Sequence, residues 1–462
     1  MYNKICEVLK DKIIEKIDNS YSILLYSGDL ATITQLNLNN SNISEINGIE
    51  KFTALTDLNI SNNNISNIQS LSSLSSLNKL SAYGNSITDL SPISNLNGLQ
   101  YLNVSKNKLT DSTYDSENTI TKKISSLTNL TELDLSHNYL RYTNGLVTLT
   151  KLTNLNLYDN AIRDLTGLSP LVNLTKLNLG ENNENNTSTI NGLNSLNNLT
   201  ILKYLDFSEN QIAEIINYIT NLVNLETLSL QGNRITDISK LSNLTKLKVL
   251  NLYSNSIQTI PSGLFQLVNL EELILGKNDL RQITELCINN NGTYSLAWNN
   301  LKKIDLSSNR FIYSSYAGEQ STRVNENSKV IEVLKSRVSE LNYEYLTDTS
   351  SLPHYDQAGT AYVTYDDFGA KCDGVYDDFI AIRNAHNYAN NYGYEVRATT
   401  GKTYHIFKYY ESGADVLTSV DWQNATFIIH DEEIEWVSGR FENILSFSNN
   451  RDVTTINNPS WT

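Results

Sequence analysis

The stretch LTELDLSHNYL (residues 130–140) follows the pattern LxxLxLxxNxL, and copies of it recur along much of the chain. Four close copies are LTDLNISNNNI (55–65), LTNLNLYDNAI (152–162), LETLSLQGNRI (225–235) and LKVLNLYSNSI (247–257). The asparagine recurs as Asn63, Asn85, Asn107, Asn138, Asn160, Asn182, Asn210, Asn233, Asn255, Asn278 and Asn309, with Ser41 in its place in the first copy. These twelve copies are 22 or 23 residues apart, except at three steps of 31, 28 and 31 residues.

Each part of the pattern has a physical interpretation. In LxL, the alternation predicts a short strand whose two leucines point inward and whose middle residue points outward. The asparagine amide has both donors and an acceptor, so stacked asparagines can satisfy the backbone of the bend as a structural ladder. Between strands the apolar residues step by three, as in Ile87, Leu90 and Ile93, which suits 3₁₀ turns. No single copy can bury its own apolar face, so neighbouring copies must stack.

This is the leucine-rich repeat signature, and it predicts an α/β solenoid: a horseshoe of about twelve repeats with short parallel strands and 3₁₀ turns. The stretch LTNLTELDLSHNYL (127–140) also resembles the 22-residue repeats of the bacterial internalins, and the resemblance extends over residues 33–311. It implies a binding role for the concave face and an extracellular location. It also implies a helical N-terminal cap at 1–32, where Ile5, Val8 and Leu9 begin an amphipathic pattern.

The concave face provides the candidate binding residues. The residue between the two leucines is nearly always small and polar, and tyrosines stand at other outward positions. Tyrosine is enriched at binding hot spots because it buries a large area and keeps a polar tip; the alternative is that tyrosine is simply frequent, with 27 in the chain. The predicted ligand-binding residues are Tyr83, Tyr101, Glu132, Asp134, Tyr158, Tyr204, Asp206 and Tyr253. Because neighbouring strands are about 4.8 Å apart, we expect Tyr83 and Tyr101 to lie side by side.

The repeat pattern stops after Phe311. SKVIEVLKSRVSELN (328–342) places Val330, Leu334 and Leu341 on one helical stripe, which predicts a C-terminal cap helix within residues 312–345. Residues 346–360 are rich in turn-forming residues and are interpreted as a linker.

A new domain is predicted at 361–462, and it opens with an aspartate-rich stretch, YDDFGAKCDGVYDDF (365–379). The spacing of its acids does not fit a calcium-binding EF-hand loop. A turn followed by a helix fits better, with Phe379 and Ile382 on the buried side and Gly393 as the stop signal.

The run DFGAKCDGVYDDFIAI (367–382) resembles the opening of the pectate-lyase-like right-handed parallel β-helices over about 45 residues. The resemblance implies a structural role for Asp373, Asp377 and Asp378, which would cap and position the first helix; a metal site and a catalytic acid cluster are the alternatives. Too few residues follow for catalytic coils. We therefore predict a small, truncated β-helix-like domain that is vestigial or completed by another chain.

Composition restricts the partners. The formal net charge of -15 argues against nucleic acid and anionic membranes. Cys6, Cys287 and Cys372 are too far apart for a disulfide framework or a zinc motif. We expect no cofactor and no metal. No secretion signal or transmembrane-length apolar run is visible, which favours a cytoplasmic or phage-associated protein, in contrast to the extracellular location that the internalin resemblance implies.

Three functions remain open at this stage. The first is a non-enzymatic recognition protein that binds a protein or glycan on the concave face and oligomerises through its C-terminal piece. The second is a polysaccharide-active lyase or hydrolase with the repeats as a targeting module, which would need an acid pair near the C-terminus. HDEEIEW (430–436) is the nearest acidic cluster and is also consistent with a polar strand edge. The third is a phage tail or tailspike-like appendage.

Overall fold

The structure is a computed structural model. It describes residues 30–111, 118–182, 190–280, 282–309, 319–343, 353–368, 370–372, 378–406, 414–416, 420–421, 426–429 and 445–447. The predicted N-terminal cap helix, the HDEEIEW cluster and the loops at 112–117 and 183–189 lie outside these residues. The chain divides into two compact units, one formed by residues 1–275 and 296–303 and the other by 276–295 and 304–462.

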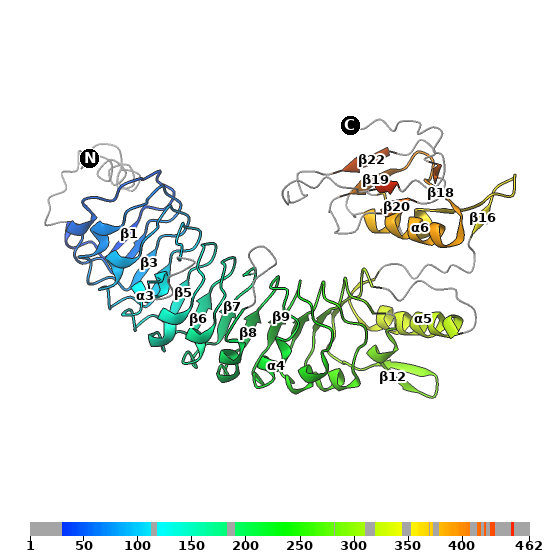
Figure 1. Ribbon diagram of the computed structural model, residues 1–462, viewed down its shortest axis with the longest axis horizontal. Coiled ribbons are helices and arrows are strands. Elements are labelled where there is room, and N and C mark those ends of the chain that lie inside the picture. The colour runs from blue at the N-terminus through cyan, green and yellow to red at the C-terminus, as the bar shows by residue number, and fades with distance from the viewer. Residues whose placement is uncertain are drawn as a thin grey trace, which may run out of the picture. The chain divides into compact units, whose positions relative to one another are not determined.

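One sheet of thirteen strands runs through the repeats (Figure 1). Its strands, in spatial order, are β1 (Gln35–Asn37), β2 (Asp57–Asn59), β3 (Lys79–Ser81), β4 (Tyr101–Asn103), β5 (Glu132–Asp134), β6 (Asn154–Asn156), β7 (Lys176–Asn178), β8 (Tyr204–Asp206), β9 (Thr227–Ser229), β10 (Val249–Asn251), β11 (Glu272–Ile274), β14 (Lys303–Asp305) and β15 (Glu340–Asn342). Strands β1 to β11 and β14 are the twelve predicted copies, so the solenoid prediction is confirmed.

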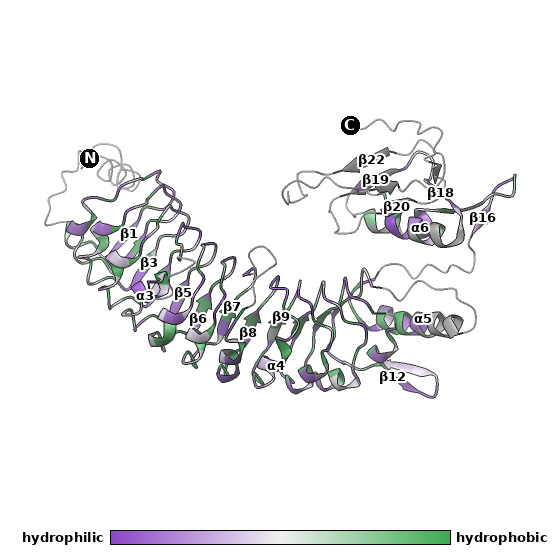
Figure 2. Cartoon of the chain, in the orientation of Figure 1, coloured by the Kyte–Doolittle hydropathy of each residue, from purple (hydrophilic) through white to green (hydrophobic). Residues whose placement is uncertain are grey.

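The register of the sheet places equivalent residues of neighbouring repeats side by side. From β1 to β11 every neighbouring pair is parallel, and the first leucine of each LxL lies beside its equivalent, as Leu102 does beside Leu133 and Leu133 beside Leu155. These leucines are buried. Figure 2 shows hydrophobic and hydrophilic residues alternating along the turns of the repeats. A strand of three residues suffices because only its middle residue has to reach the core, and stacking supplies the rest of the burial.

Short helical turns return the chain from one strand to the next. Most are 3₁₀ helices, as the three-residue apolar step predicted: η1 (Ile49–Lys51), η2 (Gln69–Leu71), η3 (Ser91–Ile93), η4 (Asn144–Thr148), η5 (Thr166–Leu168), η7 (Leu193–Asn198), η8 (Ser239–Asn243), η9 (Ser262–Gln266) and η10 (Thr284–Leu286). Two are single-turn α-helices, α3 (Ile120–Lys123) and α4 (Ile216–Ile219).

The last long step between repeats contains a hairpin that we did not predict. Strands β12 (Cys287–Asn290) and β13 (Thr293–Leu296) are joined by Asn291 and Gly292, both with positive φ (53° and 90°). Asn-Gly is the preferred sequence for such a two-residue turn. Trp298 follows the hairpin and fills an apolar position of the repeat, where its indole N–H donates to the Leu264 carbonyl (3.3 Å).

The predicted cap helix differs from the observed one. Helix α5 (Glu319–Arg337) begins nine residues before the predicted start and ends before Leu341. Residues 340–342 form strand β15 instead, and the Leu306 amide donates to the Asn342 carbonyl (2.7 Å). The backbone groups of β14 need a neighbour at this end of the sheet, and β15 satisfies part of that demand. The helical stripe itself is buried, with Val330, Ile331 and Leu334 in the core.

The predicted linker is also partly wrong. Residues 354–355 form strand β16 (His354–Tyr355), which pairs antiparallel with β17 (Ala361–Thr364). A 3₁₀ turn, η12 (Asp366–Phe368), and helix α6 (Phe379–Tyr392) follow, and α6 ends at Gly393 with φ 72°, as the sequence indicated.

The later strands stack as successive coils. Strands β18 (Glu395–Arg397), β19 (Thr403–Ile406) and β20 (Ala414–Val416) pair in parallel with β21 (Val420–Asp421), β22 (Thr426–Ile429) and β23 (Leu445–Phe447), respectively. Paired residues are 23 to 31 positions apart. Three strands of one turn lying on three strands of the next is the arrangement of a coiled parallel solenoid.

Candidate functional site

The ladder asparagines are buried and fully engaged by backbone groups. The Asn138 amide donates to the carbonyls of Val104, Leu135 and Ser136 (3.0–3.1 Å), and its oxygen accepts from the Leu109 amide (3.0 Å). Asn63, Asn85, Asn107, Asn160, Asn182, Asn210 and Asn233 bond in nearly the same way. Each ladder asparagine therefore connects its own turn with the preceding repeat, and it is not available to a ligand.

The residue before each ladder asparagine has a left-handed backbone. In the middle of the sheet these residues are Lys106, His137, Asp159, Glu181 and Glu209, with φ between 50° and 55°. This conformation costs a side-chain-bearing residue roughly 1–2 kcal/mol, and glycine and asparagine adopt it most readily. Charged side chains thus stand in a row along one border of the exposed face of the sheet, at positions where glycine would be less strained.

The small polar residue between the two leucines has a structural function that we did not predict. Its side-chain oxygen accepts the backbone N–H two residues further on, which closes the end of the strand as an Asx turn. Asp134 accepts from Ser136 and Asp206 from Ser208 (both 3.0 Å). Asn37, Asn59, Asn103, Asn156, Asn178, Asn251 and Asp305 do the same. Part of each predicted binding carboxylate is therefore used to hold the fold.

The expectation that Tyr83 lies beside Tyr101 is wrong. The register pairs Tyr101 with Lys79, whose ammonium lies 5.3 Å from the Tyr101 ring centre. Tyr83 comes four residues after Lys79, beyond the end of β3, and the Lys106 ammonium lies 6.0 Å from its ring. The predicted tyrosines fall into two rows: Tyr101 and Tyr204 begin strands, as does Glu132, whereas Tyr83, Tyr158 and Tyr253 follow strands.

Tyr158 is the best-supported aromatic side chain on the exposed face. A Cβ at position 180 would lie 3.0 Å from Cδ2 of Tyr158, so the ring occupies the space over Gly180. Burial and the carboxylates of Glu181, Asp159 and Asp206 together raise the pKa of Tyr158 well above its usual value. The phenol therefore stays neutral and remains a donor throughout the physiological range.

His137 lies on the other side of Tyr158. Its ring is edge-on to Tyr158 at 5.3 Å between centres, and its Nδ1 is 2.7 Å from a carboxylate oxygen of Asp159. Both His137 and Asp159 are about half exposed. The contacts with Gly180 and His137 thus hold the Tyr158 ring between neighbouring repeats.

Tyr204 is held in a similar way on β8. The Lys176 ammonium lies 5.0 Å from the Tyr204 ring centre, a cation–π distance. Burial and the carboxylate of Asp206, on the same strand, raise the pKa of Tyr204. Carboxylates therefore contribute to the raised pKa of both tyrosines.

We name these residues the central patch: His137, Tyr158, Asp159, Glu181, Tyr204 and Asp206. Strands β5 to β8 and the residues directly after them contribute six carboxylates, against the lysines Lys176 and Lys203: Glu132, Asp134, Asp159, Glu181, Asp206 and Glu209. Tyr158, Tyr204 and Asp206 were predicted from the sequence, and the other three residues of the central patch were not. The signal was present, because the missed residues each immediately precede a ladder asparagine.

The aspartate-rich stretch is bonded within the described residues from 353 to 447, which we call the C-terminal unit. The buried carboxylate of Asp378 accepts from the amides of Lys371 (2.8 Å), Cys372 (3.2 Å) and His405 (2.9 Å). Asp367 bonds the His354 ring and the Thr364 amide, and Asp366 bonds Lys402. Asp373 and Asp377 lie outside the described residues.

Among the residues that the structure describes, no three histidine, cysteine or acidic side chains come together as a group able to hold a metal ion. None of the helices found in that part of the chain is both long and apolar enough to span a membrane.

Comparison with known proteins agrees with the fold. A leucine-rich repeat family model matches residues 223–280, and a model of two leucine-rich repeat copies matches residues 200–243. No curated protein matches the sequence. The class of the chain is the leucine-rich repeat solenoid.

Among solved structures, the chain is similar to internalin inlF of Listeria monocytogenes, with 25% identity and a TM-score of 0.57, over 74% of this chain and 95% of that one. A leucine-rich repeat protein of Leptospira interrogans matches with 23% identity and a TM-score of 0.46, over 69% and 85% of the two chains. The functional domain of InlJ from Listeria monocytogenes matches with 20% identity and a TM-score of 0.44, over 83% and 77%. The solenoid is thus internalin-like; none of these matches supports the pectate-lyase resemblance of the C-terminal unit.

Proposed function

We propose that this protein is a non-enzymatic recognition protein that binds a protein partner through the central patch. The observation that carries the proposal is the support of Tyr158, whose ring lies over Gly180 and packs edge-on against His137. An aromatic side chain held in place before binding loses little conformational freedom on binding, which is the property of a hot-spot residue. Internalin-like leucine-rich repeat proteins generally bind proteins, and this supports the same function.

The charge of the surrounding face favours a partner with a basic segment. Six carboxylates lie in or just after strands β5 to β8, and the lysines nearest to Tyr204 along these strands are Lys176 and Lys203, the latter paired with Glu226. Complementary charge steers association and excludes acidic competitors, and its contribution decreases as salt is added. Arginine or lysine side chains could also stack on the two tyrosine rings.

For the C-terminal unit we propose the start of a β-helix that anchors or multimerises the protein. The stacking of β18, β19 and β20 on β21, β22 and β23 supports this assignment, as does the DFGA…DG…DD motif. Asp366, Asp367 and Asp378 are each bonded to other parts of the same unit, which favours a structural role for them over catalysis. Polysaccharide activity and a phage-appendage role remain the alternatives to this proposal.

The binding proposal can be tested with immobilised full-length protein and a peptide array graded in net charge. We expect basic peptides to bind best and their affinity to fall with added salt. Tyr158→Ala should weaken the best binders at least about tenfold, the usual effect of removing a hot-spot aromatic. Asn95→Ala, an exposed change in a helical turn, is the control and should have no effect. Binding that is unchanged in both Tyr158→Ala and Tyr204→Ala would contradict the proposal.

A further inference from the structure

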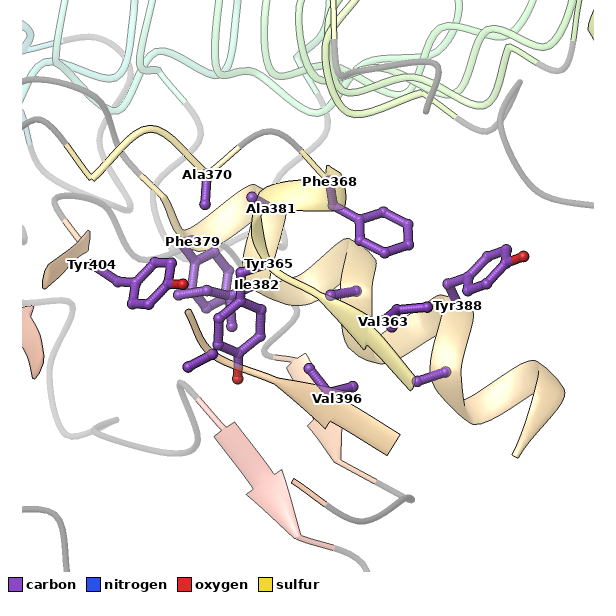
Figure 3. Close-up of a cluster of buried hydrophobic side chains, with 13 residues drawn as sticks. Val363, Tyr365, Phe368, Ala370, Phe379, Ala381, Ile382, Tyr388, Val396 and Tyr404 are labelled. Atoms are coloured by element: carbon purple, nitrogen blue, oxygen red, sulfur yellow. The ribbon is translucent and has the colours of Figure 1, made fainter. Parts of the chain in front are cut away.

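A histidine lies in the core of the C-terminal unit. His386, on α6, is fully buried. Its Nε2 is 3.1 Å from the Tyr365 hydroxyl, and the Tyr365 ring packs edge-on against Tyr404 at 5.1 Å between centres. Figure 3 shows Tyr365 and Tyr404 gathered with Phe379 and Ile382 in the same buried cluster. This is a predominantly apolar environment for an imidazole.

The second ring nitrogen has no partner. Nδ1 of His386 is buried and makes no hydrogen bond to any residue that the structure describes. A neutral imidazole already leaves one of its two nitrogens unsatisfied here. An imidazolium would have two N–H donors, so protonation would place a positive charge and an unpaired donor in the core, which is costly.

The acids on the elements packed against α6 are bonded to other groups. On η12, Asp366 bonds Lys402 and Asp367 bonds His354. The Asp378 carboxylate, at the start of α6, is occupied by three backbone amides.

The remaining charged and titratable groups lie on strands. On β18, Glu395 and Arg397 bond each other, and Arg397 also bonds Asp356 and lies over the Tyr362 ring of β17. Strand β19 contributes Tyr404 and His405, and β20 contributes Asp415, whose side chain lies outside the described part of the chain. Burial is the only cause that shifts the pKa of His386, which it lowers to about 4.

We propose that His386 is an acid-sensitive switch for the C-terminal unit: on acidification this unit loses folding stability while the repeat sheet keeps its own. The buried, half-satisfied imidazole is accommodated best when neutral. In the unfolded chain a histidine has a pKa of about 6.5. The stability that depends on a neutral His386 is therefore fully present above that pH and is lost progressively as pH falls towards the folded-state pKa. At pH 5, linkage between these two values lowers the folding equilibrium constant of the unit on the order of 30-fold.

The test uses the full-length protein equilibrated in urea at pH 7.5 and at pH 5.0, then pulse-labelled by hydrogen exchange at one common pH. Mass spectrometry reports the urea midpoint of the α6 peptide and of repeat peptides separately. In the wild type we expect the α6 midpoint to fall between the two pH values. His386→Gln keeps a donor and an acceptor near the Tyr365 hydroxyl without titrating, and should remove most of that fall. His137→Gln, in the repeats, should leave it unchanged.

Two further measurements separate the alternatives. If His386→Gln does not fold at pH 7.5, the histidine ring NMR signals of the wild type decide: His386 should remain neutral in the folded unit down to about pH 5, as expected from its lowered pKa. A His386 that titrates near its ordinary pKa in the folded unit overturns the proposal. The proposal is also overturned if the α6 midpoint still falls at pH 5.0 in His386→Gln, or if Asp415→Asn abolishes that fall. Either result would assign the switch to another group.

Discussion

The repeat solenoid and the C-terminal unit use buried polar side chains in different ways. In the solenoid each polar position recurs in every turn, and a single amide such as Asn160 serves one bend among many. In the C-terminal unit one carboxylate, Asp378, joins the loop at 371–372, the start of α6 and strand β19. Repetition therefore divides the structural task among many residues, whereas the non-repeating unit concentrates it. Substitutions in each region test this difference.

The largest effect is expected where two repeats touch through backbone. A Cβ at Gly167 would lie 1.8 Å from the carbonyl oxygen of Thr143 in the preceding repeat. The backbone cannot yield as a flexible side chain would, so Gly167→Ala should cost about 3 kcal/mol or more of unfolding free energy. Urea unfolding followed by circular dichroism measures this cost.

Gly263→Ala is the matched control for this substitution. Its Cβ would meet Ser242 at an ordinary 3.4 Å, so it should be neutral or slightly stabilising. Equal losses in the two variants would show that the close approach of the repeats is not the cause.

The second prediction concerns the asparagine ladder. Asn160→Ala removes three donated bonds and the acceptor for the Leu140 amide, and should cost about 2–3 kcal/mol because buried backbone groups lose their partners. Asn156→Ala removes only one bond, to the Tyr158 amide at a partly exposed site, and should cost about 0.5 kcal/mol. Urea unfolding measures both variants, and equal midpoints would contradict the ladder assignment.

The third prediction compares two aspartates. Asp378→Asn puts an NH₂ group where three amide N–H donors converge on two oxygens, and should destabilise the C-terminal unit by about 2 kcal/mol. Asp134→Asn keeps the one oxygen that its Asx turn needs, and asparagine already occupies that position in half of the repeats, so the change should stay within about 0.5 kcal/mol. Urea unfolding with hydrogen-exchange readout distinguishes the units. A loss at Asp134 as large as that at Asp378 would remove the contrast between them.

The sequence was sufficient to predict the repeat fold because its signals are local and repeated. Leu133 fits a buried strand position and Asn138 fits the bend that follows it, and the same pattern recurs in twelve copies. The neighbour of Tyr101 could also have been found: counting back 22 residues gives Lys79, which is its partner in the structure. The error lay in comparing tyrosines by repeat number without comparing their positions within the repeat.

Other features had a weaker signal. Asn62, Gly84 and Gly232 occupy the position of Asp159 and Glu181 in other repeats, which indicates left-handed backbone there, but a glutamate such as Glu181 seldom adopts it by itself. Strand β15 follows a helix whose apolar pattern continues past its actual end, and only the free edge of β14 explains why residues 340–342 leave the helix. Both features depend on a neighbour, and a neighbour is known only once the fold is known.

The smallest predicted effect has the opposite sign. Glycine occupies left-handed positions in both regions, as at Gly393 and Gly232, whereas Lys106 holds such a position with φ 52°. Lys106→Gly should therefore relieve strain and raise the unfolding free energy by about 1 kcal/mol. Gly232→Ala, the reverse change at the equivalent position of another repeat (φ 65°), should lower it by at least as much, because its Cβ would also lie 2.2 Å from the Glu209 carboxylate, which has to move. Urea unfolding of both variants measures the pair. A gain in Lys106→Gly would mean that the chain keeps a charged side chain at a cost in stability, which is expected of a residue on a binding face. If Lys106→Gly brings no gain while Gly232→Ala brings a loss, the Lys106 side chain, near the Tyr83 ring, offsets the strain of its own backbone. No function would then be needed to explain the row of charged residues.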